Sequence, residues 1–359
     1  MRTDSRARWD FSFFPSLAAV DGRYKRPLSW TKSRSKMISA DRFIPLVAST
    51  SIFFLMVMIV LAFVAFCTGI VTMAGIFHGV QIFNGLAHFI KGGVFFFLGL
   101  ITMLRCSGCF SGRGWAWNLK VSTSSPSRKW SGSVTMEGVE CLLIFIYGIT
   151  NVFLEHLSGW GGAWTPQDLE HVAISLLFIG GGLCGLMVES RASFSRRQAS
   201  EDSLTLNEKQ ILIPGYSTNP VPAMIIFLLG TILGGHHQDT VESTMMHKWF
   251  GNFLTAASIM RSLTYLLLYI APAKSISPSR PPSELVTSFG LMSGGLMLMA
   301  SNRDTVDAMI ENHLNAMLVA TVTMGITAVL MAWCLALVAV NDWAQRREGG
   351  TKVPRKGLE

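Results

Sequence analysis

The chain has 359 residues, half of them hydrophobic and only 14% charged. A soluble domain carries about 25% charged residues, so this composition, with a mean hydropathy of +0.41, argues against a soluble globular protein. The formal charge is +8, but the basic residues lie between apolar segments and near the chain ends, and no nucleic-acid-binding motif accompanies them. We therefore expect a membrane protein and no nucleic-acid partner.

Residues 1–42 are basic, polar and rich in serine, and we expect a disordered tail near anionic lipid. They lack the short apolar core of a signal peptide. They weakly resemble a mitochondrial transit peptide, but Asp4, Asp10 and Asp21 argue against one. A plasma-membrane or endomembrane location is therefore favoured, with a mitochondrial one left open.

Long apolar runs follow this tail. No charged side chain occurs from Phe43 to Ile90, which is room for two helices, because a spanning helix needs about 20 mainly apolar residues. The whole pattern predicts an all-α, polytopic transmembrane bundle over residues 43–341, followed by a basic tail at 342–359. We expect eight spans within it, at residues 44–67, 78–104, 136–157, 167–189, 221–238, 243–270, 284–301 and 311–341.

The distribution of Lys and Arg predicts how the bundle is oriented. These residues concentrate before the first span, after the second, fourth and sixth spans, and after the last. Because cytoplasmic segments are enriched in Lys and Arg, both termini are expected in the cytoplasm. Residues 190–219 would then form a cytoplasmic loop between two halves of four helices each.

Three glycine pairs have the GxxxG spacing that lets transmembrane helices approach closely. They are Gly181 with Gly185, Gly230 with Gly234, and Gly290 with Gly294. The spans that contain these pairs are expected to pack inside the bundle. A glycine-lined pathway or hinge is the alternative.

In this topology all eight histidines lie toward the non-cytoplasmic end of the bundle, several of them next to acidic residues. Imidazole and carboxylate together are the usual ligands of zinc and similar divalent metals. No HExxH motif or pair of histidines four residues apart is present, so a site would have to be assembled from several helices. The candidate metal ligands are His88, His156, His171, His236, His237 and His247, with Glu155 and Glu170 in support.

Several functions remain open for these histidines. A site for a divalent metal or for protons would suit a transport-type bundle. A membrane haem protein is an alternative, but two-haem electron transfer across the bilayer would need a second histidine pair in the inner leaflet, and the sequence offers none there. The third alternative is a structural or lipid-interacting bundle without a polar site. No catalytic residues are apparent, so a non-enzymatic role is favoured, and the oligomeric state is not predicted.

Four charged residues lie inside predicted spans or at their edges, where an ionisable group is costly unless it is paired or faces water. They are Lys91, Glu137, Glu140 and Arg261. Glu137 and Glu140 share one helix face at a spacing of three residues. We expect Lys91 to pair with Glu155 or Glu170, and Arg261 with Glu140 or Glu284.

Several segments together carry a resemblance to a known family. They are His88-Phe-Ile-Lys-Gly-Gly-Val, Tyr147-Gly-Ile-Thr-Asn-Val-Phe-Leu-Glu155, Asp168-Leu-Glu-His171, Gly235-His-His-Gln238, His247-Lys-Trp-Phe-Gly251, Arg261-Ser-Leu-Thr-Tyr265 and Arg280-Pro-Pro-Ser-Glu284. Through these segments the chain resembles the fungal YTP-type multi-pass membrane proteins over residues of about 80–340. The resemblance implies an integral membrane protein of unestablished activity, which supports the fold more than any chemistry.

Overall fold

The computed structural model describes residues 40–79, 81–122, 134–154, 161–205, 211–235 and 238–350. The chain separates into two compact units, Ser12–Ile76 and a larger unit that includes Phe77–Glu359. The described part of the smaller unit is dominated by α1 (Ala40–Ala74). Its segment Val57–Ala74 has a mean hydropathy of 2.5, which is enough for a membrane span.

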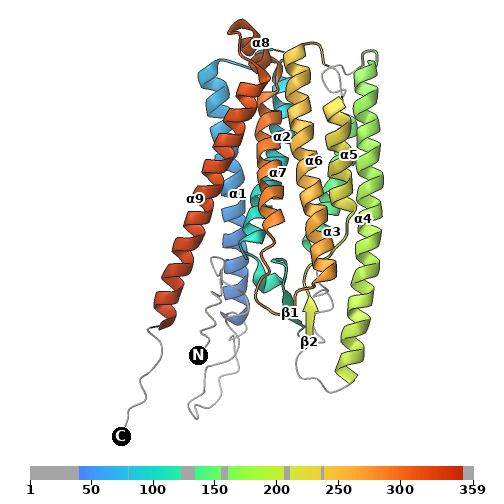
Figure 1. Cartoon of the computed structure of the whole chain (residues 1–359), viewed down its shortest axis with the longest axis vertical. Helices are drawn as coiled ribbons and strands as arrows, with labels where there is room; N and C mark the ends of the chain where they lie inside the picture. The colour runs from blue at the N-terminus through green and yellow to red at the C-terminus, as the bar shows by residue number, and fades with distance from the viewer. Residues whose placement is uncertain are drawn as a thin grey trace. The chain divides into compact units, whose positions relative to one another are not determined.

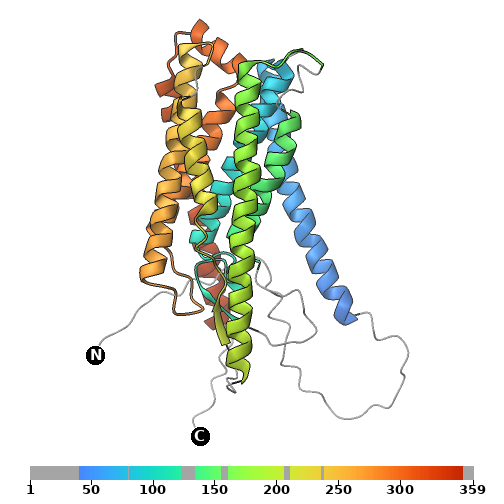
Figure 2. The ribbon, with the colours of Figure 1, turned by 90° about the vertical axis from the view of Figure 1, so that its right-hand side faces the viewer.

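The larger unit is a bundle of long helices that run up and down in chain order (Figures 1 and 2). Each helix from α3 to α7 is antiparallel to the one before it, and α9 continues the alternation after the short helix α8. Their bounds are α2 (Gln81–Cys106), α3 (Met136–Leu154), α4 (Pro166–Thr205), α5 (Val221–Gly235), α6 (Val241–Ile270), α7 (Pro282–Ala300), α8 (Arg303–Glu311) and α9 (Ala316–Gly350).

Seven helices in the described residues are long and apolar enough to cross a membrane: α1, α2, α3, α4, α6, α7 and α9. The predicted all-α polytopic bundle is confirmed. The fifth predicted span, residues 221–238, corresponds to α5, which has 15 residues and falls short of the usual spanning length of about 20. The cytoplasmic placement of both termini stays a prediction.

Two regions differ from the sequence-based expectation. Residues 190–205 continue α4 as helix instead of forming a loop, because their charged side chains exclude them from hydrocarbon but not from a helix that extends beyond it. Before the last span, α8 occupies the connection between the predicted spans 284–301 and 311–341, and α9 begins at Ala316. Asn302 caps α8 by accepting a hydrogen bond from the backbone N–H of Thr305 at 2.9 Å.

A small layer of short strands and turns lies at the end of the bundle where α3, α5 and α7 begin (Figure 1). Strands β1 (Leu119–Ser122) and β2 (Ile211–Pro214) pair there as an antiparallel ribbon, with Leu119 opposite Pro214. The 3-10 turn η1 (Ser111–Arg113) lies between α2 and β1. This layer brings the α2–α3 connection against the segment that leads into α5.

Glycines set the closest helix contacts. A Cβ atom added to Gly92 of α2 would lie 2.5 Å from the carbonyl oxygen of Gly295 on α7, and one added to Gly230 of α5 would lie 2.8 Å from the carbonyl oxygen of Gly251 on α6. Small residues allow such close backbone approach in membrane bundles. The predicted role of the GxxxG glycines in packing is supported for α5 by Gly230 and for α7 by Gly290, which approaches Phe253 and Ala257 of α6.

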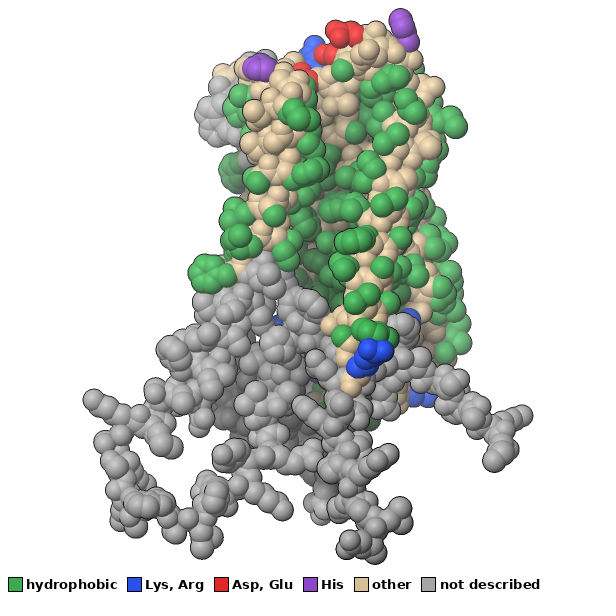
Figure 3. All heavy atoms as spheres, turned by 90° about the vertical axis from the view of Figure 1, so that its left-hand side faces the viewer, with side chains coloured by type: hydrophobic (Ala, Val, Ile, Leu, Met, Phe, Trp, Pro, Cys, Tyr) green, Lys and Arg blue, Asp and Glu red, His purple; other side chains and the backbone are tan. Residues whose placement is uncertain are grey.

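The apolar core lies between α5, α6 and α7 and includes the fully buried Met246, Phe250, Leu254 and Met297. Hydrophobic side chains also extend along the helices on the surface shown in Figure 3. Acidic and histidine side chains on that surface gather at one end. An apolar flank with charges confined to the ends is the distribution that a lipid environment favours.

Candidate functional site

Two of the predicted metal ligands come together from different helices. His88 lies about two turns from the start of α2, and His247 lies about two turns from the start of α6. Both helices begin at the same end of the bundle (Figure 1). The ring centroids of His88 and His247 are 6.0 Å apart, with the ring planes at 84°. His247 is buried at 8% exposure and His88 is half-buried.

The same local hydrogen bond orients both rings. Nδ1 of His88 lies 2.8 Å from the carbonyl oxygen of Asn84, and Nδ1 of His247 lies 2.9 Å from that of Ser243. Because a carbonyl oxygen can only accept, each Nδ1 is the protonated donor. In the neutral ring the lone pair is then on Nε2, which is the tautomer of a histidine that binds metal through Nε2.

A third histidine and a lysine complete the local electrostatic environment. His171 of α4 and Lys91 of α2 are both near enough to His88 to interact with it electrostatically. We call His88, His171 and His247 the histidine group. Glu170 is exposed on the first turns of α4.

The structure does not bring together the whole predicted ligand set. Among the residues it describes, no three His, Cys, Asp or Glu side chains are arranged to hold a metal ion. Glu155, His156, His236 and His237 lie outside the described residues, so their part in the site, and the predicted pairing of Lys91 with Glu155, stay predictions.

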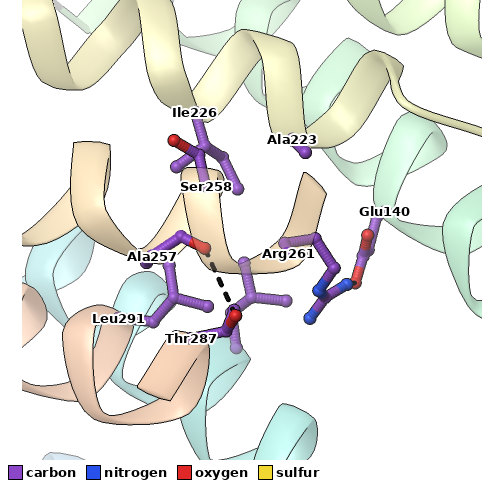
Figure 4. A pocket seen from close by; sticks show the side chains of 9 residues that line it. Glu140, Ala223, Ile226, Ala257, Ser258, Arg261, Thr287 and Leu291 are labelled. Atoms are coloured by element: carbon purple, nitrogen blue, oxygen red, sulfur yellow. Dashed lines mark hydrogen bonds and ion pairs between the residues drawn. The ribbon is translucent and has the colours of Figure 1, made fainter. Parts of the chain in front are cut away.

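A second polar group lies farther along the bundle, toward the end where α3 and α7 begin. Arg261 of α6 forms ion pairs with Glu284 of α7 at 2.9 Å and with Glu140 of α3 at 3.4 Å. Its Nη2 also donates to the hydroxyl of Thr102 on α2 at 2.9 Å. The predicted pairing of Arg261 with Glu140 or Glu284 is confirmed with both residues at once, and Figure 4 shows Glu140 and Arg261 facing each other.

A neighbouring pair extends this group. Nη2 of Arg105, at the end of α2, donates to Oε1 of Glu137 at 2.7 Å. Its Nε donates to the carbonyl oxygen of Trp115 at 2.6 Å, and its guanidinium lies 3.6 Å from the ring centre of Trp117. The other carboxylate oxygen of Glu137 accepts from the backbone N–H of Ser217 at 3.2 Å.

We call the five charged residues of these pairs the buried ion network: Arg105, Glu137, Glu140, Arg261 and Glu284. None of them is more than 7% exposed. Sequence reasoning interpreted Arg105 only as one of the basic residues that set orientation. The face of α3 that carries Glu137 and Glu140 could have indicated that Arg105 is buried. Two carboxylates on a buried helix face need more than one cationic partner.

A small cavity lies beside the network. It is lined by Glu140 and Arg261, by the polar side chains of Ser258 and Thr287, and by apolar residues that include Ile226 (Figure 4). Its size gives room for about one water molecule. Most of the lining is apolar, with polar groups supplied by Glu140, Arg261, Ser258 and Thr287, and the volume leaves room for a single water and no larger ligand.

A family model for the YTP1-like protein, C-terminal, matches residues 61–342 of the chain. The chain belongs to the YTP1-like family. The matched segment contains both the histidine group and the buried ion network, so both are parts of the family's domain. Together with the seven helices of the described residues that are long and apolar enough to cross a membrane, the family assignment establishes an integral membrane protein with the lipid bilayer as its environment.

Curated relatives of this YTP1-like chain are fungal membrane proteins. An uncharacterized membrane protein of Saccharomyces cerevisiae is 41% identical over 280 residues, which cover 74% of this chain and 43% of the relative. An uncharacterized membrane protein of Schizosaccharomyces pombe is 38% identical over 292 residues, which cover 78% of this chain and 56% of the relative. Protein YTP1 of S. cerevisiae is 23% identical over 172 residues, or 48% of this chain and 32% of that protein. The chain thus spans about half the length of the first two relatives.

Proposed function

We propose that this YTP1-like chain is a non-enzymatic, transport-type bundle that binds a divalent metal ion at the histidine group. Zinc is the metal that we favour, because neutral imidazole is one of its common ligands. The observation that supports the proposal best is the contact between His88 and His247. These residues come from two different helices, and their ring centroids are 6.0 Å apart.

The distance between the two rings suits a shared ion. Zinc lies about 2.0–2.1 Å from a ligating imidazole nitrogen, so the centres of two rings that share one zinc are about 5–6 Å apart. The hydrogen bonds from Nδ1 to the carbonyl oxygens of Asn84 and Ser243 place the lone pair of each neutral ring on Nε2. Both rings could bind one ion when the two Nε2 atoms point toward the same place.

Two ligands leave room for further ones. Water and the carboxylate of Glu170 are candidates, as is His171, which lies within electrostatic range of His88. The sequence-based candidates His156, His236, His237 and Glu155 remain part of the proposal. A transport role is favoured over a purely structural one because ionisable groups inside a membrane bundle usually mark an ion pathway, and this bundle has them at two levels.

The test is zinc binding to the full chain purified in detergent, measured by titration calorimetry and by metal analysis after dialysis. We expect the double variant His88→Ala/His247→Ala to lose at least about tenfold in affinity, or about 1.4 kcal/mol. The matched control is His78→Ala, because His78 is exposed and is not one of the candidate ligands. It should bind zinc as the unchanged chain does.

Two outcomes would contradict the proposal. Negligible zinc in all three proteins would remove the metal site, and equal zinc in all three would place the metal elsewhere. An absorption spectrum recorded after expression with added haem tests the redox alternative, since a Soret band lost in the double variant would favour haem instead.

A further inference from the structure

The buried ion network contains more acidic groups than basic ones. Arg105 and Arg261 supply two positive charges, while Glu137, Glu140 and Glu284 supply three carboxylates. An uncompensated charge in a buried site is costly, and such a group usually becomes neutral by binding or releasing a proton. The network therefore balances when one of its three carboxyl groups holds a proton.

Other charged or titratable groups near the network do not remove this excess. Glu189 of α4 is buried and accepts a hydrogen bond from Thr135 at 2.7 Å. Arg280 precedes α7 in a half-buried position, and Asp342 of α9 is buried, so the two further carboxyl groups outnumber the one further cation. Cys141 on α3 and Tyr265 on α6 are neutral in their protonated forms. The part of α5 that lines the cavity contributes only Ala223 and Ile226.

The contacts distinguish the three carboxyl groups. Glu137 is held as a carboxylate, because one oxygen lies 2.7 Å from Arg105 and the other accepts from the backbone of Ser217. Glu284 has a 2.9 Å contact between its Oε1 and Nε of Arg261, although neither atom makes a hydrogen bond. Glu140 accepts a hydrogen bond from Nη1 of Arg261 at 3.4 Å, which is the longest ion pair of the network, so the charge attraction to an arginine is weakest at Glu140.

Two further features point to a proton at this place. Both carboxylate oxygens of Glu284 are buried and have no hydrogen-bond partner in the part of the chain that the structure describes, so the network offers acceptors that lack a donor. The cavity beside Glu140 and Arg261 has room for about one water. A protonated Glu140 supplies a donor, and a water in the cavity can accept it and relay the proton.

We infer that Glu140 is a proton-binding site inside the bundle, stabilised by the excess of carboxyl groups around Arg261. This site is separate from the histidine group. Arg261 follows His247 by 14 residues on α6, which places the two levels about 21 Å apart along the helix. The bundle would then bind protons near one end and a metal ion near the other, and the inference does not depend on the metal.

Infrared spectroscopy of the full chain in lipid tests the inference directly. At neutral pH we expect a carbonyl band from a protonated carboxyl group, shifted on exchange into heavy water. The band should disappear in Glu140→Gln and persist in Glu311→Gln, which changes the same side-chain type at an exposed position outside the network. Glu137→Gln and Glu284→Gln each leave two carboxyl groups beside two arginines, so the band should weaken in both.

Unfolding provides a second readout. Glutamine has the shape and the neutrality of a protonated glutamate, so Glu140→Gln should fold and keep its unfolding midpoint, whereas Glu137→Gln should lower it. The inference is overturned if no variant removes a carbonyl band, or if Glu284→Gln removes it while Glu140→Gln does not. Failure of Glu140→Gln to fold would also contradict it, because that variant mimics the proposed state.

Discussion

Nη2 of Arg105 and Oε1 of Glu137 lie 2.7 Å apart, although the residues are 32 positions apart in the chain and neither is more than 1% exposed. The pair joins the end of α2 to the start of α3. Trp117 covers the guanidinium at 3.6 Å, which adds a cation–π contact in a desolvated position. The connection between the two helices is therefore fixed by a charge pair that has little access to water.

Replacing Arg105 by methionine should strongly destabilise the bundle. The change leaves the Glu137 carboxylate buried without its cation, and breaking a buried pair in this way costs about 3–5 kcal/mol. The denaturation midpoint in an SDS titration measures it. The control is Arg303→Met, because Arg303 and Asp307 form a surface contact at 3.9 Å with 64% and 55% exposure, and exposed pairs contribute about 1 kcal/mol or less. Equal effects of the two changes would contradict the assignment.

Adding a methyl group at Gly92 should separate α2 from α7. In Gly92→Ala the new Cβ would lie 2.5 Å from the backbone oxygen of Gly295, and overpacking of this kind costs about 1–3 kcal/mol. Gly325→Ala on α9 is the matched control, since nothing lies within 4 Å of that Cβ position. There we expect a small gain of about 0.5–1 kcal/mol from helix propensity, so the two changes should shift the unfolding midpoint in opposite directions.

Asn219 should be essential for the junction of α4 and α5. Its side-chain oxygen accepts from the backbone N–H of Val221 at 3.1 Å, and its amide donates to the carbonyl oxygen of Gly185 at 3.0 Å. In Asn219→Ala both backbone partners lose a buried hydrogen bond, for a cost of about 1–3 kcal/mol. Asn312→Ala is the comparison, because Asn312 is exposed and bonds only to its own helix, at Ala308. A midpoint equal to that of Asn312→Ala would show that Asn219 is not a structural link.

The thiol of Cys109 should react slowly with maleimide until the pH is strongly alkaline. Burial raises the pKa of Cys109 to about 12, and only the thiolate is nucleophilic. The folded state favours the neutral thiol, so its contribution to stability is complete below the unfolded pKa of about 8.5 and is lost as the pH rises toward 12. Mass spectrometry of the labelled peptide measures the rate. Cys109→Ala gives the background, and fast labelling of folded protein at neutral pH would disprove the prediction.

The sequence predicted the bundle well because lipid imposes a simple rule on it. Long uncharged runs such as Phe43–Ile90 need no knowledge of tertiary contacts to be assigned as spanning helices. The length of α4 was harder to predict. Arg191 and the charged residues after it are costly to place in the hydrocarbon layer, but they can still form a helix that extends beyond it. The separate helix α8 was missed because its Asn302 cap lies within a polar turn that also resembles an ordinary loop.

The candidate site could be predicted only in part. The position of a residue along a helix follows from the sequence. The sequence could therefore place His88 and His247 toward the same end of the bundle. Which side chains face each other depends on helix rotation, and the sequence does not give it. For the same reason Arg261 could be paired in advance with two acidic candidates, whereas Arg105 could not be recognised as a member of the network.

The shortness of α5 has a consequence for the surrounding lipid. Fifteen residues span about 22 Å, whereas the hydrocarbon layer is about 30 Å thick. Lipids beside α5 must then compress or tilt to match the helix, at a cost of a fraction of a kcal/mol for each ångström. Thinner bilayers need less of this deformation, so hydrophobic mismatch at α5 would favour residence of the protein in the thinner membranes of a cell.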